Sequence, residues 1–264
     1  MSSLEEPVLV QNRIIHALDV STIGEAIQMV EELEAWVGHY KIGLEFQTST
    51  LTQIMFAPND HMAVATVQDL RALGRYIRPD RLMWDGKFHD ISETMGKAVQ
   101  GLRSCAPKFF TVHASAGKIA LERVAKEQGS STALAVTVLT SIDEPTCESI
   151  FGDKPGKKVV QFARMAREAG IRGVVCAPNE AALLRNDAVC ADMTIVTPGV
   201  RPLWSEPNDQ NPDRIMTPGK AIMAGADYVV IGRPIKNGAD YVGSRVKAAK
   251  LIDEEIEAAL AELG

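Results

Sequence analysis

KKVVQFARMAREAGIRGVVCA, residues 157–177, contains one complete step from a helix to a strand. Its first part, residues 157–170, has an apolar face at helical spacing that is made by Val159, Val160, Phe162, Ala163 and Ala166. Gly170 is a typical helix stop, and the apolar run RGVVCA that follows at 172–177 is typical of a buried strand. A helix that leads straight into such a strand indicates a right-handed unit of a parallel sheet.

The same alternation continues along the whole chain. Seven further apolar runs have the length and composition of strands: RIIHAL (13–18), HYKIG (39–43), RLMWDGK (81–87), KFFTVHA (108–114), TALAVTVL (132–139), MTIVT (193–197) and YVVIG (228–232). Amphipathic stretches such as residues 23–37 lie between them. Eight repeats over about 250 residues predict an α/β protein with one (β/α)8 (TIM) barrel domain over residues 1–264. A doubly wound open sheet is the alternative, but no GxGxxG motif opens the first helix.

One connection is much longer than the others. Residues 44–81 separate the second and third expected strands, which exceeds the usual length of one strand-to-strand connection. We therefore expect an insertion around residues 44–80, with a helix over about residues 64–76. The sequence suggests no function for this segment.

Composition narrows the class of protein. The 264 residues are 46% hydrophobic and 23% charged, which is ordinary for a globular protein with a sizeable core. The formal net charge of −6 argues against a general nucleic-acid binder. A local binding site for an anionic substrate is still compatible with it.

The cysteines and the N-terminus indicate where the protein works. The four cysteines are far apart and form no CxxC pair, so neither a zinc site nor a disulfide framework is expected. The first residues are acidic and lack a long apolar core, and no stretch has the roughly 20 apolar residues that cross a bilayer. We therefore expect a cytoplasmic protein without a membrane segment.

Charged residues lie at the ends of the first three expected strands. They are Asp19 after the first strand, Lys41 in the second, and Asp85 and Lys87 in the third, with Asp90 close behind. Barrel enzymes keep their chemistry at this end of the strands, and Asp85 and Lys87 share one face because they are two residues apart. Neighbouring carboxylates keep lysines protonated, so we expect a lysine that acts as a general acid rather than as a Schiff-base nucleophile.

The last two strands end in residues that suit an anionic group. Arg201 follows the seventh strand in TPGVRP (197–202), and Gly232 and Arg233 follow the eighth in IGRP (231–234). Barrels commonly hold phosphate at this position, and guanidinium groups bind phosphate well. Gln210, in the loop 205–214, is an amide that could reach a substrate from above.

With these motifs in their order, the chain resembles the orotidine 5′-monophosphate decarboxylases of the bacterial type, the last enzymes of de novo UMP synthesis. The segments that carry the resemblance are LDV (18–20), KIG (41–43), DGKFHDI (85–91), VHAS (112–115), VTVLTS (136–141), TPGVRP, DQ (209–210) with RIMTP (214–218), and DYVVIGRPI (227–235). They span nearly the whole chain. The family usually has Pro after DI, where this chain has Ser92.

The resemblance implies a role for each matching residue. Lys87 would protonate C6 of the pyrimidine as carbon dioxide leaves, with Asp85 near the scissile carboxylate. Asp90 and Thr94 would enter the partner's site in a homodimer with shared active sites, where Asp90 completes an array with Lys41, Asp85 and Lys87. The remaining substrate contacts would be Asp19 and Lys41 to the ribose, Thr140 and Ser141 to the pyrimidine, and Arg201, Gln210, Gly232 and Arg233 to the phosphate. The family uses no metal ion and no organic cofactor.

Two alternatives accompany this interpretation. A magnesium-dependent sugar-phosphate decarboxylase or aldolase of the same barrel group shares DxKxxD, but it typically has a metal-binding Glu where Lys41 stands, and a lysine would repel the cation. A catalytically inactive phosphonucleotide-binding protein would keep the phosphate arginines and lose the charged array, whereas this sequence has both.

Overall fold

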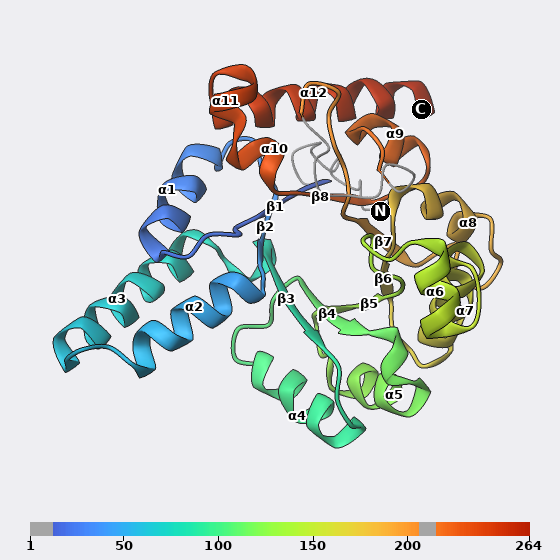
Figure 1. Cartoon of the computed structure of the whole chain (residues 1–264), viewed down its shortest axis with the longest axis horizontal. Helices are drawn as coiled ribbons and strands as arrows, with labels where there is room; N and C mark the ends of the chain where they lie inside the picture. Colours follow the sequence, from blue (N-terminus) through green and yellow to red (C-terminus); the bar gives the residue numbers. More distant parts are fainter. Residues whose placement is uncertain (1–12, 206–214) are drawn as a thin grey trace, which may run out of the picture.

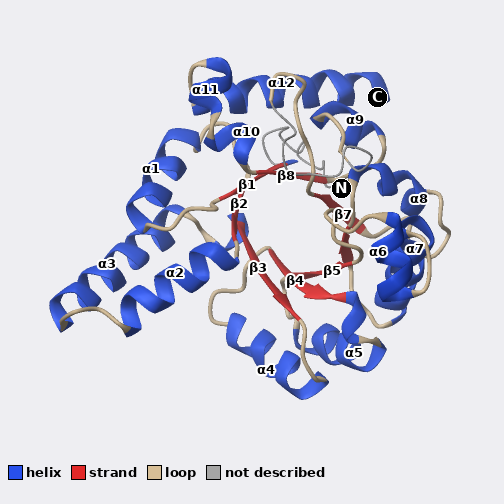
Figure 2. Cartoon of the chain, viewed as in Figure 1, coloured by secondary structure: helices blue, strands red, loops and turns tan. Residues whose placement is uncertain are grey.

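Eight parallel strands close into a barrel in the order β1 to β8, and helices surround it (Figures 1 and 2). The structure is a computed structural model that describes residues 13–205 and 215–264. Each strand pairs in parallel with its two neighbours, and β1 closes the ring against β8 through pairs such as Ile15 with Val230. The expected (β/α)8 barrel is therefore confirmed, and the open sheet is excluded.

The strands occupy the eight expected runs. Their bounds are β1 Ile14–Ala17, β2 His39–Ile42, β3 Leu82–Phe88, β4 Phe109–His113, β5 Thr132–Val136, β6 Gly173–Val175, β7 Thr194–Thr197 and β8 Tyr228–Ile231. The expected strand over residues 132–139 was too long at its end, because its neighbour β6 stops at Val175. Both the backbone N–H and the hydroxyl of Thr137 donate to the Val175 carbonyl, and the chain then leaves the sheet.

The described helices form the outer layer. Those of the first half are α1 Ile23–Leu33, α2 Leu44–Met55, α3 Asp60–Tyr76, α4 Ser92–Leu102 and α5 Lys118–Glu127. Those of the second half are α6 Glu144–Phe151, α7 Pro155–Glu168, α8 Ala181–Arg185, α9 Pro218–Met223, α10 Arg233–Lys236, α11 Gly238–Val242 and α12 Arg245–Leu263. Short 3-10 turns occupy Pro79–Arg81, Ala114–Ala116 and Pro178–Glu180. Within these described residues, none of the helices combines the length and apolar character that crossing a membrane requires.

Three helices differ from the expected ranges. Helix α1 ends at Leu33 rather than at residue 37, after which the chain turns and Val37 packs into the core. Helix α7 is shifted by two residues and begins at Pro155, whose missing N–H costs nothing at the first helical position. The helix expected over residues 64–76 begins earlier, at Asp60, because the Asn59 side chain caps it by accepting from the Met62 N–H. That residues 44–80 are an insertion stays a prediction.

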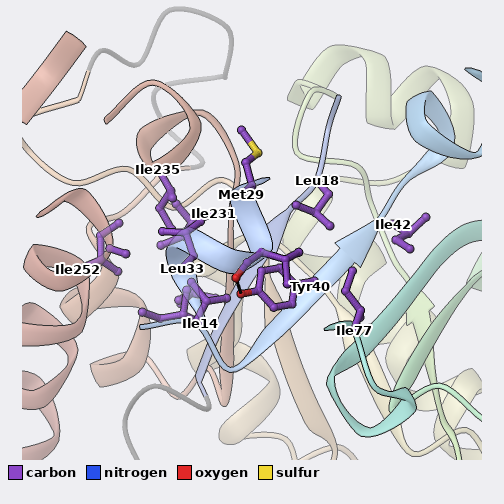
Figure 3. Packing of buried hydrophobic residues seen from close by; sticks show 14 of the residues in the cluster. Ile14, Leu18, Met29, Leu33, Tyr40, Ile42, Ile77, Ile231, Ile235 and Ile252 are labelled. Carbon is purple, nitrogen blue, oxygen red and sulfur yellow. Dashed lines mark hydrogen bonds between the residues drawn. The ribbon is translucent and has the colours of Figure 1, made fainter. Parts of the chain in front are cut away.

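Side chains of the strands alternate between the barrel interior and the helices. Inward-facing residues form one small cluster, made by Ile15, Ala17, Met83, Phe109, Leu134, Val196 and Val230. Outward-facing residues pack against the helices in two larger clusters. Figure 3 shows one of them, in which Ile14, Tyr40 and Ile231 from the strands meet Met29 and Leu33 of α1 and Ile252 of α12. The strands are thus buried on both faces, as a parallel sheet requires.

One buried histidine makes the stability of the barrel depend on pH. His16 lies in β1 on the same face as Ile14 and is fully buried. Its Nδ1 donates to the Ile231 carbonyl at 3.0 Å, and its Nε2 has no hydrogen-bond partner among the described residues. Burial lowers the pKa of His16 from 6.5 to about 4, so the ring is neutral in the folded chain.

We expect this histidine to destabilise the fold as the pH falls. Between pH 6.5 and about 4 the unfolded chain binds a proton that folded His16 does not, so stability is present above this window and is lost on descending through it. From pH 7 to pH 5 the loss due to His16 should be about 2 kcal/mol. Urea unfolding at both pH values measures it, and His16→Gln should show a smaller loss by that amount. Equal losses in the two proteins would contradict the assignment.

Candidate active site

The ends of the strands surround a hollow of about 520 Å³ at the mouth of the barrel. Its floor is apolar and is formed by inward-facing residues of five strands, namely Ala17, Met83, Val136, Val175 and Val230. Its walls carry charged side chains: Asp19, Lys41, Glu45, Asp85, Lys87, Arg201, Arg233 and Lys236. A polar rim above an apolar floor is typical of a site that binds a small polar molecule.

Strand β3 supplies the centre of this site. Met83 belongs to the interior cluster, so Asp85 and Lys87, at the next two alternate positions, also point inward, whereas Trp84 packs outside the barrel. The register between β3 and β4 shifts between Trp84 and Phe88, and Lys87 adopts a positive φ of 44°. Such a conformation is rare for a residue other than glycine and is found mainly at functional sites.

Four of the expected residues form one continuous charged array. The Lys87 ammonium lies 2.7 Å from the Asp85 carboxylate, and the Lys41 ammonium lies 3.3 Å from the same Asp85 oxygen, Oδ2. Lys41 also lies 3.1 Å from Asp19. Signs therefore alternate from Asp19 through Lys41 and Asp85 to Lys87.

The array keeps its buried members charged. Burial alone would lower the pKa of Lys41, but the Asp85 and Asp19 carboxylates outweigh it and hold that pKa above its ordinary value. Burial alone would raise the pKa of Asp85, which is 4% exposed, but Lys41 and Lys87 hold it below the ordinary value. Lys41 and Asp85 are thus ionised near neutral pH.

A second part of the wall of the hollow is cationic. Arg201 is buried and Arg233 is exposed, and both line the hollow beside Gly232. Burial, together with the nearby Arg233 charge, lowers the pKa of Arg201 to about 10, so the guanidinium stays charged at neutral pH. A bound dianion would relieve the repulsion between the two arginines. Gln210, the fourth residue assigned to this group, lies outside the described residues.

The other expected residues divide between the hollow and the surface. Thr140 lines the hollow, whereas Ser141 next to it is exposed and does not. Asp90 and Thr94 are also exposed and lie outside the hollow, and the Asp90 carboxylate accepts the Ile91 N–H at 2.7 Å. A single chain thus does not bring Asp90 and Thr94 to the array.

The structure adds residues that the sequence did not single out. Thr111 of β4 is fully buried and donates its hydroxyl hydrogen to Asp85 Oδ1 at 2.8 Å. Lys236 of α10 donates to the backbone carbonyl of Asp19 at 2.6 Å and so fixes the loop after β1. A polar residue at an inward position of the apolar run 108–114 was the available signal for Thr111.

A larger hollow of about 1390 Å³ lies outside the barrel, against α6 and α7. It is open, and charged groups on its walls are already in ion pairs, such as Lys154 with Glu144 and Arg164 with Asp187. The smaller hollow at the mouth of the barrel is the better candidate, because it contains the buried charges and lies where barrel enzymes keep their chemistry.

Comparison with known proteins places the chain among relatives of one kind. The sequence profile described as the Orotidine 5'-phosphate decarboxylase / HUMPS family matches residues 12–246. An orotidine 5'-phosphate decarboxylase of Heliobacterium modesticaldum is 39% identical over 264 aligned residues, which cover 95% of this chain and 98% of that protein. One of Rhodospirillum rubrum is 39% identical over 260 residues, covering 94% and 95%.

Solved structures agree on the fold. The crystal structure of orotidine 5'-phosphate decarboxylase from Lactobacillus acidophilus superimposes with a TM-score of 0.67 at 24% identity, covering 92% of this chain and 98% of that one. An uncharacterized conserved protein from Geobacillus kaustophilus gives a TM-score of 0.65 at 26% identity, covering 92% and 99%.

The cationic wall predicts that inorganic phosphate binds this chain. We expect phosphate to raise the temperature of thermal unfolding, because a ligand that binds only the folded state stabilises it. Arg233→Met should weaken phosphate binding by about 10-fold, since one charge-assisted contact is lost. Arg167→Met, which removes an arginine that pairs with Asp192 away from the hollow, is the control and should bind phosphate like the wild type. Calorimetric titration measures both, and equal affinities in all three proteins would contradict the assignment.

Proposed function

The chain belongs to the Orotidine 5'-phosphate decarboxylase / HUMPS family, and we propose on this basis that it decarboxylates orotidine 5'-monophosphate to UMP in pyrimidine biosynthesis. The observation that carries the assignment of the reacting groups is the alternating array in which Asp85 lies 2.7 Å from Lys87 and 3.3 Å from Lys41. This array provides a fixed proton donor in a hollow whose floor is apolar. The enzyme is a carboxy-lyase.

The charges of the hollow give the nucleotide one orientation. The phosphate lies against Arg201, Gly232 and Arg233, and Gln210, outside the described residues, is proposed as a further contact. The ribose hydroxyls meet Asp19 and Lys41. The pyrimidine then lies over β3, with Thr140 beside the ring and C6 above Lys87. Ser141, which is exposed outside the hollow, would have to turn inward to contact the ring. This orientation is supported by the origin of the charges: Arg201 follows β7 and Arg233 begins α10 after β8, whereas Lys41, Asp85 and Lys87 lie on β2 and β3.

The reaction needs a proton at the place where carbon dioxide departs. When the bond between C6 and the carboxylate breaks, its electron pair stays on C6, and no electron sink in the ring accepts it. The Lys87 ammonium stabilises this developing charge and then donates its proton to C6, which leaves a neutral amine that regains a proton from water. Binding of the distant phosphate helps to close the site and to position the ring.

Repulsion by Asp85 is a smaller part of this mechanism. A substrate carboxylate at about 4 Å from Asp85 would be repelled by roughly 4 kcal/mol at an effective dielectric constant of 20. The ammonium groups of Lys41 and Lys87 lie against the same carboxylate and offset much of this repulsion. Stabilisation of the carbanion by Lys87 therefore carries more of the catalysis than destabilisation of the bound substrate.

The metal-dependent alternative fits the hollow poorly. Magnesium prefers a set of oxygen ligands, and two carboxylates of the hollow, Asp19 and Asp85, already share the Lys41 ammonium between them. A divalent cation at the same place would be repelled by Lys41 and by Lys87. We therefore propose a reaction that uses neither a metal ion nor an organic cofactor.

We also propose a homodimer in which Asp90 and Thr94 complete the partner's site. Both side chains are exposed on the chain described here, next to Ile91, which is 71% exposed. Because both residues are exposed, a second copy of the chain can place them at its own site, as a symmetric dimer with shared sites requires. A cytoplasmic location is part of this proposal, and it fits the four cysteines, which lie in the described residues and form no disulfide there.

The assignment of Lys87 predicts a large loss of turnover. Lys87→Ala should lower kcat for UMP formation by about 1000-fold, because a positioned general acid is lost. Formation of UMP from orotidine monophosphate, followed by ultraviolet absorbance, measures it. Lys118→Ala, at an exposed lysine of α5, is the control and should keep wild-type turnover. If Lys87→Ala turns over at a rate close to that of the wild type, another group is the acid. In a separate test, the wild type is assayed in the presence of a chelator, and a loss of activity there would favour the metal-dependent alternative.

The shared sites predict that two inactive variants restore one another. In a mixed dimer of Lys87→Ala and Asp90→Ala, one site loses both residues while the other keeps both. After unfolding together and refolding, the mixture should regain about a quarter of wild-type activity, because half of the dimers are mixed and each has one intact site. Each variant refolded alone is the control. A mixture no more active than its components would exclude the crossing of Asp90.

A further inference from the structure

We propose that Thr111 is the positioning residue of this site, in that its single hydroxyl group orients the Asp85 carboxylate and holds the backbone of Lys87. The inference rests on the proposed function, since it concerns how the proton donor of that reaction is kept in place. Thr111 belongs to β4, and it points into the barrel because Phe109, two residues earlier, belongs to the interior cluster. It is fully buried.

The hydroxyl group makes two hydrogen bonds at once. It donates to Asp85 Oδ1 at 2.8 Å, and it accepts the backbone N–H of Lys87 at 2.9 Å. The other oxygen of Asp85, Oδ2, faces the ammonium groups of Lys87 and Lys41 at 2.7 and 3.3 Å. Thr111 therefore decides which way the carboxylate turns, and it leaves Oδ2 to the two lysines.

The bond to the backbone matters because the chain is irregular at this point. The pairing of β3 with β4 is regular at Trp84 and resumes only at Phe88, opposite Val112. Between them the Lys87 N–H turns to a side-chain oxygen instead of a carbonyl of β4. Lys87 also has a φ of 44°, which costs about 1 kcal/mol or more for a residue with a side chain. A neighbouring group must hold such a conformation in place, and the Thr111 hydroxyl does so.

Loss of the hydroxyl group would release both ends of the Asp85–Lys87 pair. Asp85 Oδ1 would lose its donor, so the carboxylate would be free to rotate and to take Lys87 with it. The Lys87 N–H would lose its acceptor inside the site, and the positive φ would lose its support. The ammonium would then spend less time at the distance and angle that proton transfer requires.

Thr111→Val tests this inference, because valine keeps the shape of threonine and removes the hydroxyl group. We expect kcat for UMP formation to fall by about 10- to 100-fold with KM within about threefold of the wild type, since an aligned proton donor is lost and the phosphate contacts are not. The acidic limb of the pH profile of kcat should move to higher pH, because a carboxylate that loses a donor is protonated more easily. Thr111→Ser should restore both kcat and the position of that limb.

A matched control separates this role from a general effect of removing a buried hydroxyl. Thr137→Val removes a buried hydroxyl that donates only to a backbone carbonyl, that of Val175 at 2.8 Å, and it should leave the acidic limb where it is in the wild type. Thermal unfolding of each variant establishes that the measured protein is folded. If Thr111→Val does not fold, Thr111→Cys, with a weaker donor, is measured against Thr111→Ser in the same way.

The outcomes are distinct. An active wild type, an impaired Thr111→Val and a restored Thr111→Ser support the inference. Two results with an active wild type overturn the inference and leave the proposed function intact. One is an unchanged kcat and pH profile in Thr111→Val, and the other is a Thr111→Ser variant as impaired as Thr111→Val. A wild-type chain that forms no UMP overturns the proposed function and this inference together.

Discussion

A carboxylate held between two ammonium groups inside a barrel is the interaction around which this site is built. Asp85 is 4% exposed, and a charge so deeply buried is tolerated only when it is paired and hydrogen-bonded. Lys41 and Lys87 supply the pairing from β2 and β3, and Thr111 supplies a hydrogen bond from β4. Because three neighbouring strands contribute, the array exists only when β2, β3 and β4 pair in their correct register. Folding and the arrangement of the reacting groups are therefore one event.

The two ends of the hollow are built from different kinds of structure. Within the charged array, Lys41 lies on β2 and Asp85 and Lys87 lie on β3, whereas Asp19 follows β1. At Lys87, where the pairing with β4 is interrupted, the Thr111 hydroxyl group holds the backbone instead. Arg201 lies in the segment after β7, and Arg233 is the first residue of α10, directly after β8.

Much of this arrangement could be predicted from the sequence. The parts that could not be predicted have one physical cause in common, which is that they depend on contacts with a neighbouring strand. Period-two alternation in RLMWDGK placed Asp85 and Lys87 on one face, and the structure shows that face to be the interior. The early end of β5 was missed because it depends on where the neighbouring β6 stops. Thr111 was missed because a threonine in an apolar strand looks like any other β-branched residue until the side chain across from it is known. The placement of Gln210 lies outside the described residues.

By itself the sequence determined the eight repeats, the parallel barrel and the identity of the charged residues at its mouth, because hydrophobic periodicity and chain order are local properties of the chain. Only the tertiary structure decided that Lys41 lies between Asp19 and Asp85, that the β3–β4 register shifts beside Lys87, and that one hydroxyl of β4 serves both Asp85 and Lys87. These are contacts between segments far apart in the sequence, and their geometry is fixed by the pairing of neighbouring strands rather than by any one segment.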